Sequence, residues 1–177
     1  MEKRLRLQSF IMSIVCVAAA SGLPQQALAF NADGYNSWMT KEQVVALATY
    51  RGLMAWENKD GLLLIGKPDT RIEGTFSFCH NWLVAYNRTI DFDTEYFPKL
   101  KELMRYYGQP VTVEAREVPW SGSGGGTLQL VDMRWYNWND RADLFFNPEA
   151  REAKGTLKYP RNANISFSTR NTCWAQF

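Results

Sequence analysis

The chain has few of the residues that build metal centres and nucleophilic active sites. Of its 177 residues, three are cysteines and only one, His80, is a histidine. A serine, cysteine or zinc site that needs histidine must therefore use His80, which follows Cys79 in a segment typical of a turn. Neighbouring residues of an extended strand point to opposite faces, which separates Cys79 from His80 if both are extended. The sequence indicates no metal site, no cofactor and no catalytic set, and it favours a protein that is not an enzyme.

The chain also lacks a run of lysine and arginine residues. It carries 20 Lys+Arg and 18 Asp+Glu; residues 1–29 hold three of the basic and one of the acidic residues, which leaves 17 of each afterwards. Binding to nucleic acid needs a basic patch or stripe, so we expect no nucleic-acid partner. After residue 29 no stretch approaches 18 consecutive apolar residues, so we expect no stable membrane anchor once the first segment is removed.

The first 29 residues have the pattern of a secretory signal peptide. Three basic residues among the first six precede an apolar run over residues 10–20, and a small-residue triplet ends at Ala29. This order predicts cleavage between Ala29 and Phe30. We therefore expect a periplasmic or secreted protein of 148 residues (177 minus 29).

Two cysteines, Cys79 and Cys173, remain after such cleavage. In an oxidising compartment two cysteines pair more often than they stay free, so we expect a disulfide between them. Two separately buried thiols are the alternative, because the number of cysteines does not fix their geometry.

Helix and strand patterns alternate along residues 30–177. Thr40 and Gln43 have capping-box spacing and predict a helix from Lys41; we favour its end at Gly52 over an extension to Trp56. Apolar residues at helical spacing predict a second helix from residue 96 that ends at residue 108. Residues 31–39 are expected to be a polar lead-in. Strands are expected over residues 53–56, 62–65, 74–79, 83–90, 111–118, 127–138, 142–147 and a last strand that ends at residues 173–174.

The order of these elements predicts an α+β fold. Strands follow strands without helices between them, which favours an antiparallel sheet over a parallel, doubly wound one. We expect two helix-plus-antiparallel-strand units, residues 38–92 and 93–177, in one compact domain over residues 30–177. A tandem repeat is one form of this arrangement.

Aromatic residues give the only signal for a binding surface. Trp120 lies in the glycine-rich segment 119–126, and Trp135, Tyr136 and Trp138 place large rings on both faces of one expected strand. Exposed aromatic side chains are enriched in protein interfaces and sugar-binding sites. These four residues form the candidate binding surface; the alternative is that the rings fill the two sides of a small sheet.

Residues 39–47, MTKEQVVAL, resemble the helix opening of the BamE/SmpA outer-membrane assembly lipoproteins and of the β-lactamase-inhibitor-like fold. The resemblance implies a short helix that leads onto a small antiparallel sheet, a unit that the inhibitors carry twice. This chain has Trp38 at the place of the family's glycine. From residue 30 onward the chain is also similar to uncharacterised exported proteins of proteobacteria, in Phe78–Cys79, residues 106–110 and Cys173.

Together these observations predict an exported, non-enzymatic envelope or interaction protein whose partner is a protein or an envelope component. Two alternatives remain. One is a periplasmic carbohydrate-binding module that uses the same aromatic residues, and the other is a small hydrolase that uses a pair of carboxylates among the 17 acidic residues after residue 29.

Overall fold

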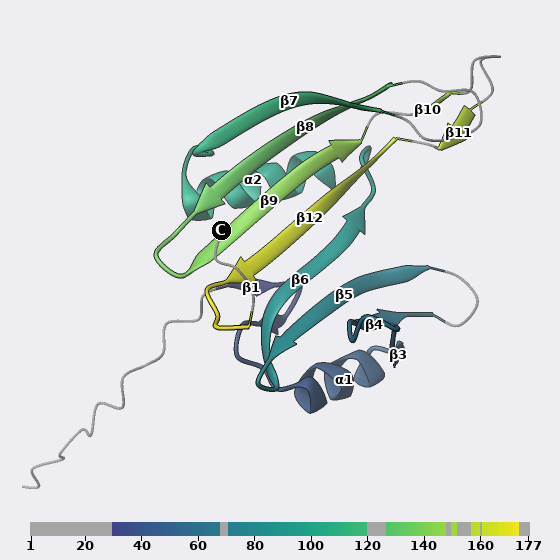
Figure 1. The fold of residues 1–177 in the computed structure, drawn as a ribbon, viewed down its shortest axis with the longest axis vertical. Coiled ribbons are helices and arrows are strands. Elements are labelled where there is room, and N and C mark those ends of the chain that lie inside the picture. The colour runs from purple at the N-terminus through teal and green to yellow at the C-terminus, as the bar shows by residue number, and fades with distance from the viewer. Residues whose placement is uncertain are drawn as a thin grey trace, which may run out of the picture.

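The described part of the chain has a mixed α+β fold in which an antiparallel sheet predominates over two helices (Figure 1). Helix α1 spans Lys41–Tyr50 and helix α2 spans Tyr96–Tyr107. The predicted signal peptide and Ala29 lie outside the part of the chain that the computed structural model describes. The described residues are 30–67, 71–119, 127–147, 150–151, 157–159 and 161–173.

The main sheet contains eight strands in the order β3-β4-β5-β6-β12-β9-β8-β7, and every neighbouring pair is antiparallel. Its strands are β3 (Met54–Glu57), β4 (Leu63–Gly66), β5 (Ile72–Cys79), β6 (Trp82–Ile90), β7 (Thr112–Pro119), β8 (Thr127–Tyr136), β9 (Asp140–Asn147) and β12 (Asn162–Thr169). Two short hairpins accompany it: β1 (Asn31–Ala32) with β2 (Tyr35–Asn36), and β10 (Ala150–Arg151) with β11 (Leu157–Tyr159).

Helix α1 begins and ends where its sequence signals predict. The Thr40 side chain accepts a hydrogen bond from the Gln43 backbone N–H, and the Gln43 side chain accepts one from the Thr40 N–H at 2.8 Å, which completes the capping box. The helix ends at Tyr50, and Gly52 follows with φ +73°. Glycine adopts this left-handed conformation without a Cβ clash, so the earlier of the two predicted ends is the correct one.

Helix α2 lies across one face of β8 and β9 (Figure 1). The Asp91 carboxylate accepts hydrogen bonds from the Thr94 N–H and hydroxyl, both at 2.8 Å, and so shapes the turn that leads into the helix. Leu103 is buried against the sheet, and Gly108 ends the helix with φ +83°. The predicted second helix is confirmed.

The two faces of the sheet differ in polarity. Neighbouring Cα partners across six strands form a buried row on the face that both helices cover: Leu63, Phe76, Tyr86, Phe167, Ala142 and Trp135. The adjoining row on the other face is mostly polar: Leu64, Thr75, Asn87, Ser166, Asp143 and Arg134. One apolar face and one polar face are the usual pattern for an antiparallel sheet with helices on one side.

Each helix precedes four strands of the main sheet. Strands β3 to β6 follow α1, and β7, β8, β9 and β12 follow α2. The last strand of each set, β6 and β12, pair with each other at the centre of the sheet, where Phe167 opposes Tyr86. Strand β12 ends at Thr169, so the expected extension of the last strand to residues 173–174 is wrong. After Thr169 the backbone N–H of Arg170 donates a hydrogen bond to the Asn139 carbonyl, and the chain leaves the sheet.

The expectation of a polar lead-in over residues 31–39 is wrong. Residues 31–36 form the β1–β2 hairpin, and Phe30, Ala32 and Tyr35 are buried in the core. Asp33 and Gly34 make the two-residue turn with φ +53° and +81°. Asp-Gly is a strong signal for a tight hairpin, so this turn was readable from the sequence.

Candidate functional site

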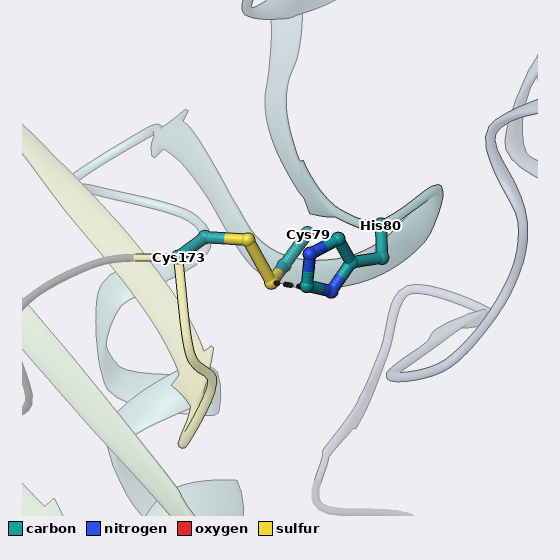
Figure 2. A group of neighbouring side chains, drawn as sticks. All are labelled: Cys79, His80 and Cys173. Carbon is teal, nitrogen blue, oxygen red and sulfur yellow. Dashed lines mark hydrogen bonds between the residues drawn. A yellow bond between two sulfur atoms is a disulfide. The ribbon is translucent and has the colours of Figure 1, made fainter.

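The predicted disulfide joins Cys79 at the end of β5 to Cys173 beyond β12 (Figure 2). The two Cα atoms are 5.7 Å apart across a sequence separation of 94 residues. Cys79 is buried and Cys173 is exposed. The bond therefore fixes the segment after β12 to the hairpin of β5 and β6, next to the central pairing of β6 with β12.

His80 and Asn81 form the turn between β5 and β6, with φ +49° and +69°. Because His80 is in a turn and not in an extended strand, its ring lies beside the disulfide, with Nδ1 3.7 Å from the Cys79 Sγ (Figure 2). Within the described part of the chain, ligand atoms of His80, Cys79 and Cys173 lie within 4.8 Å of one another. Cysteine binds metals and attacks substrates as a thiolate. The sulfurs of Cys79 and Cys173 are bonded to each other and are not thiolates, so in this state they serve as a cross-link.

Trp135 does not belong to a binding surface. Its side chain is 0% exposed, its Cα partner is Ala142 in the core, and its indole Nε1 donates a hydrogen bond to the Gly108 carbonyl at 3.0 Å. Trp135 lies on the helix-covered face, where it fills the space under the end of α2. The expectation that it contributes to the candidate surface is therefore corrected.

Tyr136 and Trp138, unlike Trp135, are exposed. Tyr136 ends β8 on the polar face and is 40% exposed, and Trp138 is 89% exposed in the turn between β8 and β9. The Arg141 guanidinium lies 5.8 Å from the centre of the Tyr136 ring. Trp120 falls outside the described residues. The structure thus leaves two of the four predicted aromatic residues exposed at the β8–β9 turn, and Arg141 lies over one of them, Tyr136.

Arg141 belongs to a chain of charges on the polar face. Its guanidinium donates to Asp143 at 2.7 and 2.8 Å, and Arg134 donates to Asp143 at 3.0 Å and to Asp132 at 2.5 Å. Burial raises the pKa of Asp143, and the adjacent Arg141 and Arg134 charges oppose that shift. The two buried carboxylates share one guanidinium, an arrangement typical of a structural ion-pair network. Arg134 and Arg141 were not singled out from the sequence, because only the pairing of β8 with β9 makes them neighbours.

A second charged network connects the β1–β2 turn with β6 and α2. The Asp33 carboxylate accepts hydrogen bonds from Arg88 Nε at 2.7 Å, Tyr86 Oη at 3.0 Å and Lys99 Nζ at 3.1 Å. Glu95 accepts from the other end of Arg88 at 2.8 Å. Burial acts to raise the pKa of Asp33, but the charges of Arg88 and Lys99 outweigh it and hold that pKa below its usual range. Sequence reasoning missed this network because its members are separated by up to 66 residues.

Asp33→Asn is expected to lower the free energy of unfolding by about 2 kcal/mol at neutral pH, because it removes the charge that pairs with Arg88 and Lys99. Asparagine also adopts positive φ readily, so the turn itself is preserved. A lowered native pKa stabilises the fold above the unfolded-state pKa and loses that effect as pH falls through the native pKa. The difference from the wild type should therefore be full at neutral pH and shrink well below about pH 4.

Urea titrations of both proteins at neutral and acidic pH measure this difference. Glu102→Gln is the matched control, because Glu102 bonds the same Lys99 from a more exposed position, and its effect should stay within about 0.5 kcal/mol. An Asp33→Asn effect of the same size at both pH values would contradict the assigned role of the charge.

Comparison with protein-family models, curated proteins and solved structures finds no match to this chain. Among the described residues, neither helix has the length and apolar character needed to cross a membrane.

Proposed function

We propose that this is an exported, non-enzymatic binding protein that contacts a protein or envelope component through the β8–β9 turn. The observation that carries the proposal is the 89% exposure of Trp138, a residue that seldom lies so open without a partner. Tyr136 and Arg141 lie on the strands that flank this turn. Tryptophan, tyrosine and arginine are the residue types most enriched at the energetic centres of interfaces, and here they occur together.

The charge network on the polar face supports a binding role over hydrolysis. A hydrolase with paired carboxylates needs one carboxyl group that is free to donate a proton and one that is free to attack or to activate water. Asp132 and Asp143 are both held by Arg134, and Arg141 occupies the second oxygen of Asp143. The network holds Arg141 beside Tyr136, which orders the surface before a partner arrives and lowers the entropic cost of binding.

Site-specific photocross-linking tests this surface. A benzophenone amino acid in place of Trp138 should yield one discrete cross-linked product in envelope extracts of the native organism. The same amino acid in place of Trp56, an exposed tryptophan on edge strand β3 at the far side of the sheet, should not yield it. The partner is then purified for affinity measurements.

The double variant Tyr136→Ala and Trp138→Ala should weaken binding to that partner at least tenfold, as expected for residues at the centre of an interface. Trp56→Ala should leave the affinity unchanged. Retained binding after alanine replacement of Trp120, Tyr136 and Trp138 would rule this surface out.

A carbohydrate ligand is the second candidate, because Trp138 offers an open ring on which a sugar can stack. A glycan array separates the two candidates. Saturable glycan binding that is lost in Trp138→Ala would favour the carbohydrate module, and an array without hits would leave the protein partner.

Export and a tandem-repeat origin complete the proposal. Export is supported by the signal-like pattern of residues 1–29 and by the disulfide, which persists in oxidising compartments. N-terminal sequencing of the periplasmic protein should read from Phe30, and an uncleaved cytoplasmic product would refute export. The repeat is supported by the order of one helix and four strands that occurs twice. If the repeat is real, α1 with β3 to β6 should superpose strand for strand on α2 with β7, β8, β9 and β12 in an experimental structure.

A further inference from the structure

A cavity of about 430 Å³ lies on the helix-covered face, away from the β8–β9 turn. Its floor is formed by β4, β5 and β6, and its walls include the β1–β2 hairpin and the residues that follow α1 and precede α2. The volume is within the range of small-molecule sites, which is about 300 to 1,000 Å³.

Buried aromatic rings lie beneath the floor of the cavity. The rings of Phe76 and Tyr86 stack with centroids 4.8 Å apart, and the Tyr35 ring meets Phe76 edge-on at 4.6 Å. Gly74 lines the cavity beside them, and a Cβ atom at that position would come within 2.9 Å of both stacked rings. A glycine is therefore required for the rings to stack here. Phe76 and Tyr86 are only 1% and 3% exposed, so the stacked pair forms a closed, rigid base beneath the cavity.

Three cations at this cavity form no direct salt bridge with a described carboxylate: Arg51, Lys67 and Arg71. Arg71 interacts with the Asp91 carboxylate only at longer range. Two of them are held in place. Arg51 lies 5.0 Å from the centre of the Tyr35 ring, and Arg71 donates to the Thr89 carbonyl at 3.3 Å.

The other charged residues of the lining are Arg88 and three carboxylates, Asp33, Glu73 and Glu95. Arg88 is bonded by Asp33 and Glu95, and Lys99 bonds Asp33 from α2. Glu73 is the third carboxylate of the lining. Four cations and three carboxylates thus line the cavity, so its lining carries a small excess of positive charge.

We propose that this cavity binds a small organic anion, a single ring that bears one phosphate or carboxylate group. Lys67 and Arg71 contact the anionic group together with Arg51, and the ring of the ligand occupies the cavity above the base that Phe76 and Tyr86 form. Charged hydrogen bonds fix the anion, since guanidinium groups match the geometry of phosphate and carboxylate oxygens. The site is independent of the proposed partner surface at Tyr136 and Trp138.

Isothermal titration calorimetry and ¹H–¹⁵N NMR with phenyl phosphate and glucose 1-phosphate test the proposal, and they distinguish an aromatic from a sugar ring. One equivalent of at least one of the two probes should bind at micromolar to millimolar concentration and shift the amide signals of Gly74 and Thr89. Phenol and glucose, the neutral counterparts, should bind at least tenfold more weakly.

Lys67→Gln and Arg71→Gln should each weaken binding of the anionic probe about tenfold, the value of one charge-assisted hydrogen bond. Arg116→Gln, which removes an exposed cation on β7 at the other edge of the sheet, should bind like the wild type. All three positions are exposed, and unchanged circular dichroism spectra verify that the variants fold.

Three results would overturn the proposal: no saturable binding of either probe at millimolar concentration, equal binding of the neutral counterparts, or unchanged affinity in both Lys67→Gln and Arg71→Gln. None of these results would count against the proposed partner surface, because Trp138 is not part of this cavity.

Discussion

Replacing Cys79 with alanine and Cys173 with serine is expected to lower the free energy of unfolding by about 4 to 5 kcal/mol. The disulfide closes a loop with a sequence separation of 94 residues, and in the chain-entropy model a loop of that length removes much of the freedom of the unfolded chain. Alanine suits the buried position 79 and serine the exposed position 173, so the double variant adds no unpaired buried polar group.

Urea titrations of the wild type and the double variant measure this loss. The wild type in the presence of a dithiol reductant provides the matched control and should unfold at the same urea concentration as the variant. A thiol count on the unfolded, unreduced wild type gives an independent result. Two reactive thiols from Cys79 and Cys173, or an unchanged unfolding midpoint in the variant, would disprove a stabilising cross-link.

Trp135→Ala is expected to destabilise the fold by about 3 to 5 kcal/mol, the usual cost of removing a large aromatic side chain from a core. The residue is fully buried, and its removal leaves a cavity beneath the end of α2 and an unpaired Gly108 carbonyl. Trp135→Phe keeps one six-membered aromatic ring in the core and loses the hydrogen bond to Gly108. Its effect on the free energy of unfolding should therefore be intermediate, about 1 to 3 kcal/mol.

Trp138→Ala is the control in the same strand and turn region. Its side chain is 89% exposed, so its replacement should change the free energy of unfolding by no more than about 0.5 kcal/mol. Guanidinium titrations of the three variants give the comparison. If Trp135→Ala and Trp138→Ala had equal effects, the assignment of one ring to the core and the other to solvent would fail.

The elements that the sequence predicts well are those with local signals. The capping box at Thr40 and the glycine stops at Gly52 and Gly108 define both helices, because capping depends on residues a few positions apart. Period-two alternation identifies β5, β6 and β12, since each has one face in the core. The disulfide was predictable as well, because only two cysteines remain after residue 29.

The features of the candidate sites that the sequence did not predict depend on contacts between distant segments. Trp135 and Tyr136 are neighbours of similar chemistry, and only the position of α2 decides which of them is buried. The cavity is likewise invisible in the sequence, because Arg51, Arg71 and the ring of Tyr86 converge from three separate elements. The β1–β2 hairpin was missed although its Asp-Gly turn is a local signal.

The position of β12 in the sheet also governs how the fold is completed. This strand is the last of the main sheet in sequence, yet it pairs with β6 on one side and β9 on the other. Until it inserts, both neighbours present unpaired backbone groups, the kind of edge on which chains associate with one another. Cys173 follows β12, so its bond to Cys79 ties the segment after β12 to the hairpin of β5 and β6. Oxidation of this pair thus opposes the release of β12, which would expose β6 and β9 as edge strands.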